Sequence, residues 1–197
     1  MAVILWIAVS ACNNDSSSNK EQNNIKQHEN MHMTDQAPAD SSIKTITAHF
    51  SDVNAETSSY IKSLMQQYLS IKNALVDDKS STAASAAGMI DDLMKGFDKS
   101  LLTTDQKRIY DDIEDDLKEH AEHISGSKLD HQREHFTMMS EDMYDLAKAF
   151  GAGMTLYHDH CPMYKDGSMW LSETKDIRNP YYGDEMMSCG SVEEKIQ

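Results

Sequence analysis

Apolar side chains recur every three or four residues along the middle of the chain. Four such stripes cover residues 61–75, 83–97, 109–124 and 129–150, with polar positions between them. This spacing is typical of amphipathic helices that bury one face, and each helix is expected to be about 18 to 23 residues long. Because the connections are short, neighbouring helices are expected to run antiparallel, which predicts an up-down four-helix bundle.

The sequence also carries signals for the ends of these helices. Ser81 is the expected N-cap of the second helix, after a polar break at residues 77–81. Residues 103–106 and 127–130 have the pattern of capping boxes, which predicts the starts of the third and fourth helices. Gly151 is expected to end the fourth helix, because glycine readily adopts the backbone conformation found just after a helix C-terminus.

Beyond Gly151 the helical spacing disappears. Residues 155–190 alternate short apolar or aromatic pieces with Gly, Pro, Asn and Asp, which is typical of small strands and turns. A segment of about 45 residues is too short for a core of its own, so it is expected to pack on the helices. The predicted fold class is therefore mainly α: a four-helix bundle with a small irregular β and loop extension at its C-terminus.

The first residues have the pattern of an export signal. The apolar run 2–9 is too short to span a bilayer, and Val9-Ser10-Ala11-Cys12 follows it. Small residues directly before a cysteine look like a bacterial lipobox, which implies cleavage before Cys12 and attachment of lipid to its sulfur. Residues 1–12 therefore predict a lipid-anchored protein of the bacterial cell envelope, periplasmic or outer-membrane. The alternative is an apolar N-terminus on a cytosolic protein.

A polar stretch separates this signal from the first helix. Residues 13–54 are dominated by Asn, Ser, Gln, Lys, Asp and Glu and bury too little apolar surface to offset the entropy of ordering. They predict a disordered linker, which leaves residues 55–197 as the folded domain. Imidazole and thioether groups in the linker are candidate accessory copper ligands: His28, Met31, His32 and Met33. The alternative is a polar linker without a metal function.

The net charge narrows the range of partners. The chain has 33 Asp and Glu residues against 18 Lys and Arg residues, for a formal net charge of −15. Nucleic acid is not an expected partner, because phosphate binding needs a basic surface. No apolar run reaches the roughly 18 residues of a transmembrane helix, so contact with the membrane is expected only through the lipid anchor.

Methionine is abundant, with 14 residues in the chain. Thioether side chains fill irregular gaps in helical cores. Five methionines lie on or beside the apolar stripes and are expected to be buried there: Met65, Met89, Met94, Met139 and Met143.

Other methionines accompany cysteine and histidine in the C-terminal segment. Two short stretches hold these side chains: His158, His160, Cys161 and Met163, and then Met186, Met187 and Cys189. Thiolate and thioether ligands select Cu(I) over hard cations, and imidazole is compatible with it. The segment therefore predicts a site for Cu(I) or another soft metal ion.

The two cysteines in this segment have a second interpretation. With Cys12 lipidated, Cys161 and Cys189 are the remaining pair, and an envelope protein lies in an oxidising compartment. A disulfide between them would close a loop of about 28 residues and stabilise the fold by roughly 3 kcal/mol. The sequence leaves the metal site and the disulfide both open.

Histidines also gather on the predicted third and fourth helices: His120, His123, His131 and His135. His131 and His135 are four residues apart and share a helix face, which can hold a metal ion. Acidic partners with the spacing of a structural zinc site do not flank them. The preferred interpretation is therefore exposed histidines on a solvated face.

Several short motifs resemble the DUF3347 family: Tyr68-Leu69, residues 74–76, residues 132–136, Cys161-Pro162-Met163, Trp170-Leu171-Ser172, residues 179–183 and residues 187–190. The resemblance covers about residues 56–192. Members occur in Bacteroidetes as short lipoproteins and as an extra domain on periplasmic adaptors of heavy-metal efflux systems. The resemblance therefore implies handling of copper or silver, and it points to Cys161, Met163, Met187 and Cys189.

The expected function is an envelope lipoprotein that binds a soft metal ion, Cu(I), for buffering or for delivery to a heavy-metal efflux adaptor or transporter. The alternative is a disulfide-stabilised protein-interaction domain without a metal function. An enzyme is not expected, because the sequence has no phosphate-binding loop, nucleophile elbow or zinc-protease motif. The remaining enzymatic alternative is a Cys161 nucleophile assisted by His158 or His160.

Overall fold

A computed structural model describes residues 43–197 of the chain. This part is mainly helical, with four α-helices, short 3-10 helices and a four-stranded sheet. The helices are α1 (Ala55–Val76), α2 (Ser80–Lys95), η2 (Lys99–Leu101), α3 (Thr104–Gly126), α4 (Leu129–Phe150) and η3 (Gly183–Glu185). The four predicted α-helices are confirmed, while their up-down order remains a prediction.

Two of the predictions fall outside the described residues. These are the lipoprotein signal with Cys12, and the linker ligands His28, Met31, His32 and Met33. Within residues 43–197, no helix is both long enough and apolar enough to cross a membrane.

The apolar stripes form the core between the helices. Four of the five methionines expected there are buried: Met65, Met94, Met139 and Met143. The prediction for Met89 was wrong, since this residue is 53% exposed. The inward face of α2 is made by Ala83, Ala87 and Ile90. Met89 immediately precedes Ile90 and so lies about 100° away from it around the helix.

Two predicted helix ends are confirmed. At the start of α3, the Gln106 backbone N–H donates to Thr103 Oγ1 at 3.3 Å, and the Thr103 N–H donates to Gln106 Oε1 at 3.1 Å. This reciprocal pair is a capping box. At the end of α4, Gly151 has a φ of +79°, a conformation that glycine adopts without steric cost.

Two other predicted caps were wrong. Helix α2 begins at Ser80 after Lys79, so Ser81 lies inside its first turn. Ser127 belongs to the end of α3, and Lys128 occupies the N-cap position of α4 without a side-chain hydrogen bond. Because the connection is so short, Ser127 is the C-cap of α3 and so is not the N-cap of α4.

The expected C-terminal strands are present and form one sheet. Strands β2 (Leu156–Cys161), β3 (Ser168–Ser172) and β4 (Ser191–Ile196) are antiparallel, with β2 between the other two. The sheet order is β1-β4-β2-β3, and β1 (Lys44–Ile46) pairs in parallel with β4. The predicted linker boundary at residue 54 is therefore too late. A three-residue strand is too short to show a regular alternation of apolar and polar side chains. Its pairing depends on β4, which is far away in the sequence.

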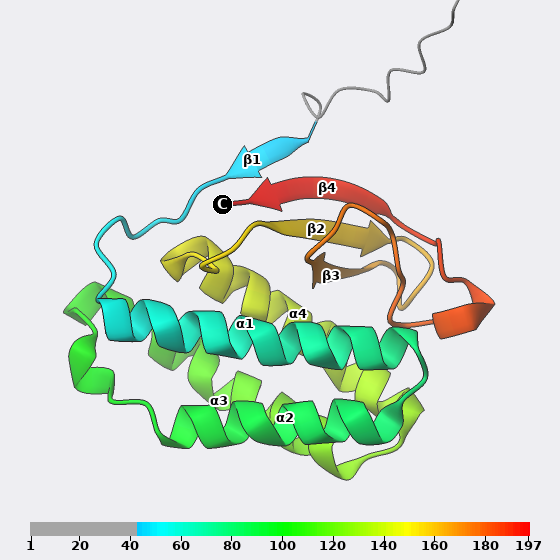
Figure 1. Ribbon diagram of the computed structural model, residues 1–197, viewed down its shortest axis with the longest axis horizontal. Helices are drawn as coiled ribbons and strands as arrows, with labels where there is room; N and C mark the ends of the chain where they lie inside the picture. The colour runs from blue at the N-terminus through cyan, green and yellow to red at the C-terminus, as the bar shows by residue number, and fades with distance from the viewer. Residues whose placement is uncertain (1–42) are drawn as a thin grey trace, which may run out of the picture. The chain divides into compact units, whose positions relative to one another are not determined.

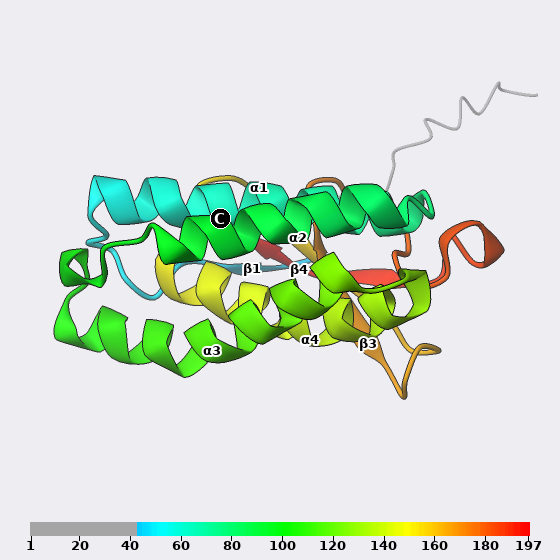
Figure 2. The same cartoon turned by 90° about the horizontal axis from the view of Figure 1, so that it is seen from below.

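The sheet lies along α1 and α4, with α2 and α3 on the far side of these two helices (Figures 1 and 2). One phenol joins the layers. The Leu171 N–H of β3 donates to the Tyr68 hydroxyl of α1 at 2.9 Å, and this hydroxyl also hydrogen-bonds with Ser140 of α4 at 2.8 Å. Tyr68 is fully buried, so this polar network lies inside the core.

Candidate metal site

Four histidines meet where α3 ends and α4 begins. His120 and His123 are three residues apart on α3, and His131 and His135 are four residues apart on α4. Side chains with these spacings share one face of a helix. Because only Ser127 and Lys128 separate the helices, the two faces come together. We call these four residues the histidine cluster.

Three members of the histidine cluster converge. One ring nitrogen from each of His123, His131 and His135 lies within 4.8 Å of the others, and no other such group of three His, Cys or carboxylate residues occurs in residues 43–197. His131 Nε2 and His123 Nδ1 are 3.3 Å apart. Two nitrogens bound to one tetrahedral ion at about 2.1 Å would be separated by about 3.4 Å, so this pair has the spacing of metal ligands.

A carboxylate orients His131. Its Nδ1 lies 3.0 Å from Glu134 Oε2, so the Nδ1–H donates to Glu134 and the lone pair of Nε2 faces His123. A carboxylate behind a ligating histidine fixes its tautomer and makes it a stronger ligand. The hydrogen bond from His131, aided by Lys165, keeps the pKa of Glu134 below its usual value, so Glu134 stays ionised.

His135 is the buried member of the converging trio, with 9% exposure. Burial, followed by the neighbouring charges of His123 and His131, lowers its pKa to about 4. Its ring is therefore neutral at neutral pH, which keeps a lone pair available for a metal ion. His135 Nδ1 lies 3.2 Å from His120 Nδ1, so Nε2 is the ring nitrogen that His135 would offer to an ion.

His120, which contacts His135 through Nδ1, also lies close to a buried carboxyl group. Its Nε2 lies 3.7 Å from Asp142 Oδ2, which is buried and has no hydrogen-bond partner. Burial, together with the nearby charge of Asp116, raises the pKa of Asp142 to about 7. His120 thus lies between Asp142 and His135, where it can set the tautomer of His135 as Glu134 sets that of His131.

The trio needs one rearrangement to bind an ion. The rings of His123 and His135 are stacked in parallel, with centroids 4.0 Å apart and planes 3° apart. The lone pairs of stacked rings do not point to one position, so one ring must rotate. His123 is 46% exposed and can do so without disturbing the core. Imidazole ligands suit copper, zinc and nickel.

The cysteines of the sequence-predicted soft-metal site also come together. Cys161 ends β2 and is buried, and Cys189 is half-buried; both are free thiols. The Cys189 thiol hydrogen-bonds with Cys161, and this bond together with burial raises its pKa to about 11. Asn179 fixes the segment by donating to the Cys189 carbonyl at 2.8 Å. We call Cys161 and Cys189 the thiol pair.

The other predicted soft ligands occupy different positions. Met163 is 62% exposed in the turn after β2. The Nδ1 atoms of His158 and His160 lie 3.8 Å and 3.4 Å from carboxylate oxygens of β4. Met186 and Met187 are half-buried in the segment that leads to Cys189. The structure thus brings the two thiols together, and the wider ligand set remains a prediction.

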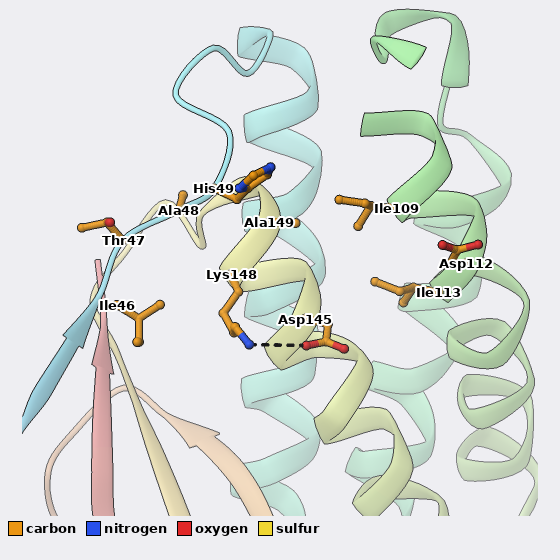
Figure 3. A pocket seen from close by; sticks show the side chains of 10 residues that line it. All are labelled: Ile46, Thr47, Ala48, His49, Ile109, Asp112, Ile113, Asp145, Lys148 and Ala149. Atoms are coloured by element: carbon orange, nitrogen blue, oxygen red, sulfur yellow. Dashed lines mark ion pairs between the residues drawn. The ribbon is translucent and has the colours of Figure 1, made fainter. Parts of the chain in front are cut away.

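A separate cavity of about 670 Å³ lies between residues 46–49, α3 and α4 (Figure 3). Its wall combines apolar side chains with His49, Asp112 and Asp145, and Lys148 Nζ lies 3.9 Å from Asp145 Oδ1. Figure 3 shows His49 on the segment after β1, Asp112 on α3, and Asp145 and Lys148 together on α4, and these groups do not converge as the histidine cluster does. The cavity is therefore a weaker candidate for a metal site.

Fold and site together define a mainly helical domain, covered by a small sheet, with a group of histidines between two of its helices whose spacing could hold a metal ion. Residues 64–155 match the model of DUF3347, a protein of unknown function, and this part of the chain belongs to that family. No curated protein and no solved structure matches the chain.

The extent of the family match bears on the two candidate sites. It begins within α1 and ends just before β2, so it includes the histidine cluster and leaves out the thiol pair. The suspected family is confirmed, while the resemblance beyond residue 155 remains a prediction. The sequence carries one signal for the histidine cluster: four histidines at helical spacing on both sides of a short turn. The interpretation of these residues as a solvated face missed their convergence.

Proposed function

We propose that this domain binds a copper ion through His123, His131 and His135. The observation that carries the proposal is the convergence of their three ring nitrogens within 4.8 Å. Copper(II) binds imidazole more tightly than the other divalent first-row metals do. Glu134 and His120 support the ligands from behind, so a bound ion would have both a ligand set and a second layer of hydrogen bonds.

The test is metal binding by the purified protein. Calorimetry with Cu(II) and Zn(II) should give one ion per chain, with Cu(II) bound more tightly, and electron paramagnetic resonance should show nitrogen coupling to the copper. His131→Ala and His135→Ala should each weaken binding at least about tenfold. His49→Ala removes a histidine outside the cluster and serves as the matched control. Equal affinity in all three variants would refute the proposal.

The thiol pair supports a second candidate, a site for Cu(I). Two adjacent thiols offer soft ligands, and the raised pKa of Cys189 means that a metal ion must displace its proton to bind there. Under reducing conditions, Ag(I) and Cu(I) should bind to the wild type and lose affinity in the Cys161→Ser and Cys189→Ser double variant. Binding of Cu(II) to the histidine cluster should persist in that variant, which separates the two candidates.

The setting of this metal function is part of the same proposal. The lipobox-like pattern before Cys12 supports a lipid-anchored protein of the bacterial cell envelope. There the domain would buffer copper or pass it to a heavy-metal efflux adaptor or transporter. Labelling cells with a palmitate analogue tests the anchor, since Cys12→Ala should abolish incorporation of the lipid.

A further inference from the structure

Next to the histidine cluster, three tyrosines form one wall of a second cavity. Its volume is about 460 Å³, within the range of ligand-binding pockets. The rings of Tyr164 and Tyr181 stack with centroids 4.6 Å apart, and Tyr182 stands perpendicular to Tyr164 at 5.6 Å. We call this cavity the tyrosine pocket. Aromatic faces of this kind attract cations through the negative charge on the ring face.

The tyrosine pocket is built in advance of any ligand. Arg133 of α4 donates from Nε to the Pro180 carbonyl at 2.9 Å and from Nη2 to the Leu75 carbonyl at 3.1 Å. Tyr182 donates to the Met163 carbonyl at 2.9 Å, which ties the two loops together. These bonds join α1, α4 and both tyrosine-bearing loops, so the pocket does not depend on a ligand for its shape.

The charge of the lining favours a cation. Four carboxylate residues line the pocket: Asp78, Asp130, Glu134 and Glu185. Arg133 is the cation among the lining residues, and its guanidinium is already bound to two carbonyl groups and to Asp78. An anionic ligand would therefore find no free guanidinium and would meet several carboxylates.

The chain itself places a cation at this site. Lys165 Nζ lies 3.6 Å from Glu134 Oε1 and 5.9 Å from the centre of the Tyr164 ring. Lys165 is 48% exposed, so its ammonium group is held loosely at the edge of the pocket. Lys165 thus shows that Glu134 and the Tyr164 ring accept a lysine ammonium group at this site.

We propose that the tyrosine pocket binds a lysine or arginine side chain of a basic segment on a protein partner. The net charge of −15 attracts basic surfaces at long range, and a cationic side chain between aromatic rings is a typical anchor of an interface. The exposed Met163 beside the pocket supplies apolar surface for the rest of such a segment. Lys165 competes for the same groups and must be displaced.

The probe is a labelled ten-residue peptide of alternating lysine and serine, titrated into the full chain by fluorescence anisotropy. We expect saturable one-to-one binding that is lost when the lysine side chains are acetylated. Tyr182→Ala and Glu185→Gln should each weaken binding about threefold or more, whereas Tyr182→Phe, which keeps the ring and loses only the hydroxyl bond to the Met163 carbonyl, should weaken it less than Tyr182→Ala does. Lys165→Ala should strengthen binding, because it removes the competing ammonium group.

A matched control separates the pocket from general attraction to an acidic protein. Asp105→Asn removes one exposed carboxylate on α3 and changes the net charge as Glu185→Gln does. If Asp105→Asn weakened binding as much as Glu185→Gln, or if Tyr182→Ala had no effect, the proposal would be overturned. Equal binding of free lysine amide and of the peptide would overturn the assignment to a protein partner. None of these outcomes depends on metal binding.

Discussion

At the scale of single residues, the histidine cluster depends on groups that would not touch the metal ion. His120 contacts His135 Nδ1 at 3.2 Å, and Glu134 contacts His131 Nδ1 at 3.0 Å. In the proposed site, each partner would hold one ligating histidine in a single tautomer. Their loss should therefore weaken metal binding less than the loss of a ligand does.

His120→Ala tests this order. It should lower the affinity for Cu(II) about tenfold with one ion still bound, whereas His135→Ala should lower it further. Calorimetry measures both effects, and the copper resonance spectrum should keep its nitrogen coupling in His120→Ala. If His120→Ala lowered affinity as much as His135→Ala and removed one coupled nitrogen, His120 would be a ligand rather than a positioning residue.

A second residue-scale prediction concerns Asp159 of β2, which is fully buried. Burial raises its pKa to about 8, although the nearby charge of Lys72 opposes the rise. Between pH 4 and pH 8 the folded protein therefore retains a proton that the unfolded chain has lost, so Asp159 lowers stability as the pH rises. Asp159→Asn should gain stability relative to the wild type on going from pH 5 to pH 8.5, by on the order of 1–3 kcal/mol.

Urea denaturation at both pH values measures this gain. Asp142, with a pKa near 7, lowers stability over part of the same range, and His135, with a pKa near 4, raises it between about pH 4 and 6.5. Both groups are present in the wild type and in the variant, so their contributions cancel in the difference. A difference that does not change with pH would contradict the assigned protonation of Asp159.

At the scale of elements, the start of α3 is capped by side chains of its own first residues, whereas the start of α4 is not. Thr103 and Gln106 cap α3 reciprocally, whereas Ser127 makes no cap for α4. Instead, Gln132 ties the start of α4 to its surroundings by donating to the Ile124 carbonyl at 2.9 Å and to the Ser80 carbonyl at 3.0 Å. The start of α4 is therefore fixed by tertiary contacts.

This difference predicts unequal effects of two similar substitutions. Thr103→Ala should lower the free energy of unfolding by about 1 kcal/mol, because a backbone N–H loses its partner at the start of α3. Ser127→Ala should change it by less than about 0.5 kcal/mol. Urea midpoints compare the two directly, and equal losses would show that Ser127 caps α4 after all.

Two glycines make a second matched pair. Gly183 has a φ of +53°, and a Cβ there would lie 2.6 Å from Asp78 Oδ1 and 2.8 Å from Arg133 Nη2. Gly183→Ala should therefore destabilise the protein by about 1 kcal/mol or more. A Cβ at Gly88, inside α2, meets nothing within 4 Å, so Gly88→Ala should be stabilising by up to about 1 kcal/mol. Thermal denaturation gives the sign of each change.

At the scale of the whole described region, the sheet joins its two ends. Strand β1 pairs with β4 through residues 44–46 and 194–196, and Lys44 Nζ lies 2.8 Å from Glu194 Oε1. The pairing covers one edge of β4, and Ile46 packs against the core. Strand β1 therefore contributes to the stability of a domain whose helices begin only at Ala55.

Shortening the chain tests this contribution. A chain that begins at residue 48 should be less stable than one that begins at residue 43, by about 1–2 kcal/mol, because it loses the strand pairing and the contacts of Ile46. Urea denaturation of the two chains measures the difference. Equal stability would mean that β1 adds nothing to the domain.

The sequence by itself determined the four helices, the capping box at Thr103, the end of α4 at Gly151 and the presence of C-terminal strands. These features depend on side-chain spacing and on hydrogen bonds between residues a few positions apart. Burial of Ile90 and exposure of Met89 differ only by rotation about the axis of α2, and the sequence did not resolve that difference.

The tertiary structure alone decided which distant groups meet. It aligned the histidine faces of α3 and α4, closed the tyrosine pocket around Arg133 and paired β1 with β4. Each of these contacts depends on helix rotation, loop path or strand register. Those are set by packing of the whole core, so no local pattern of residues specifies them.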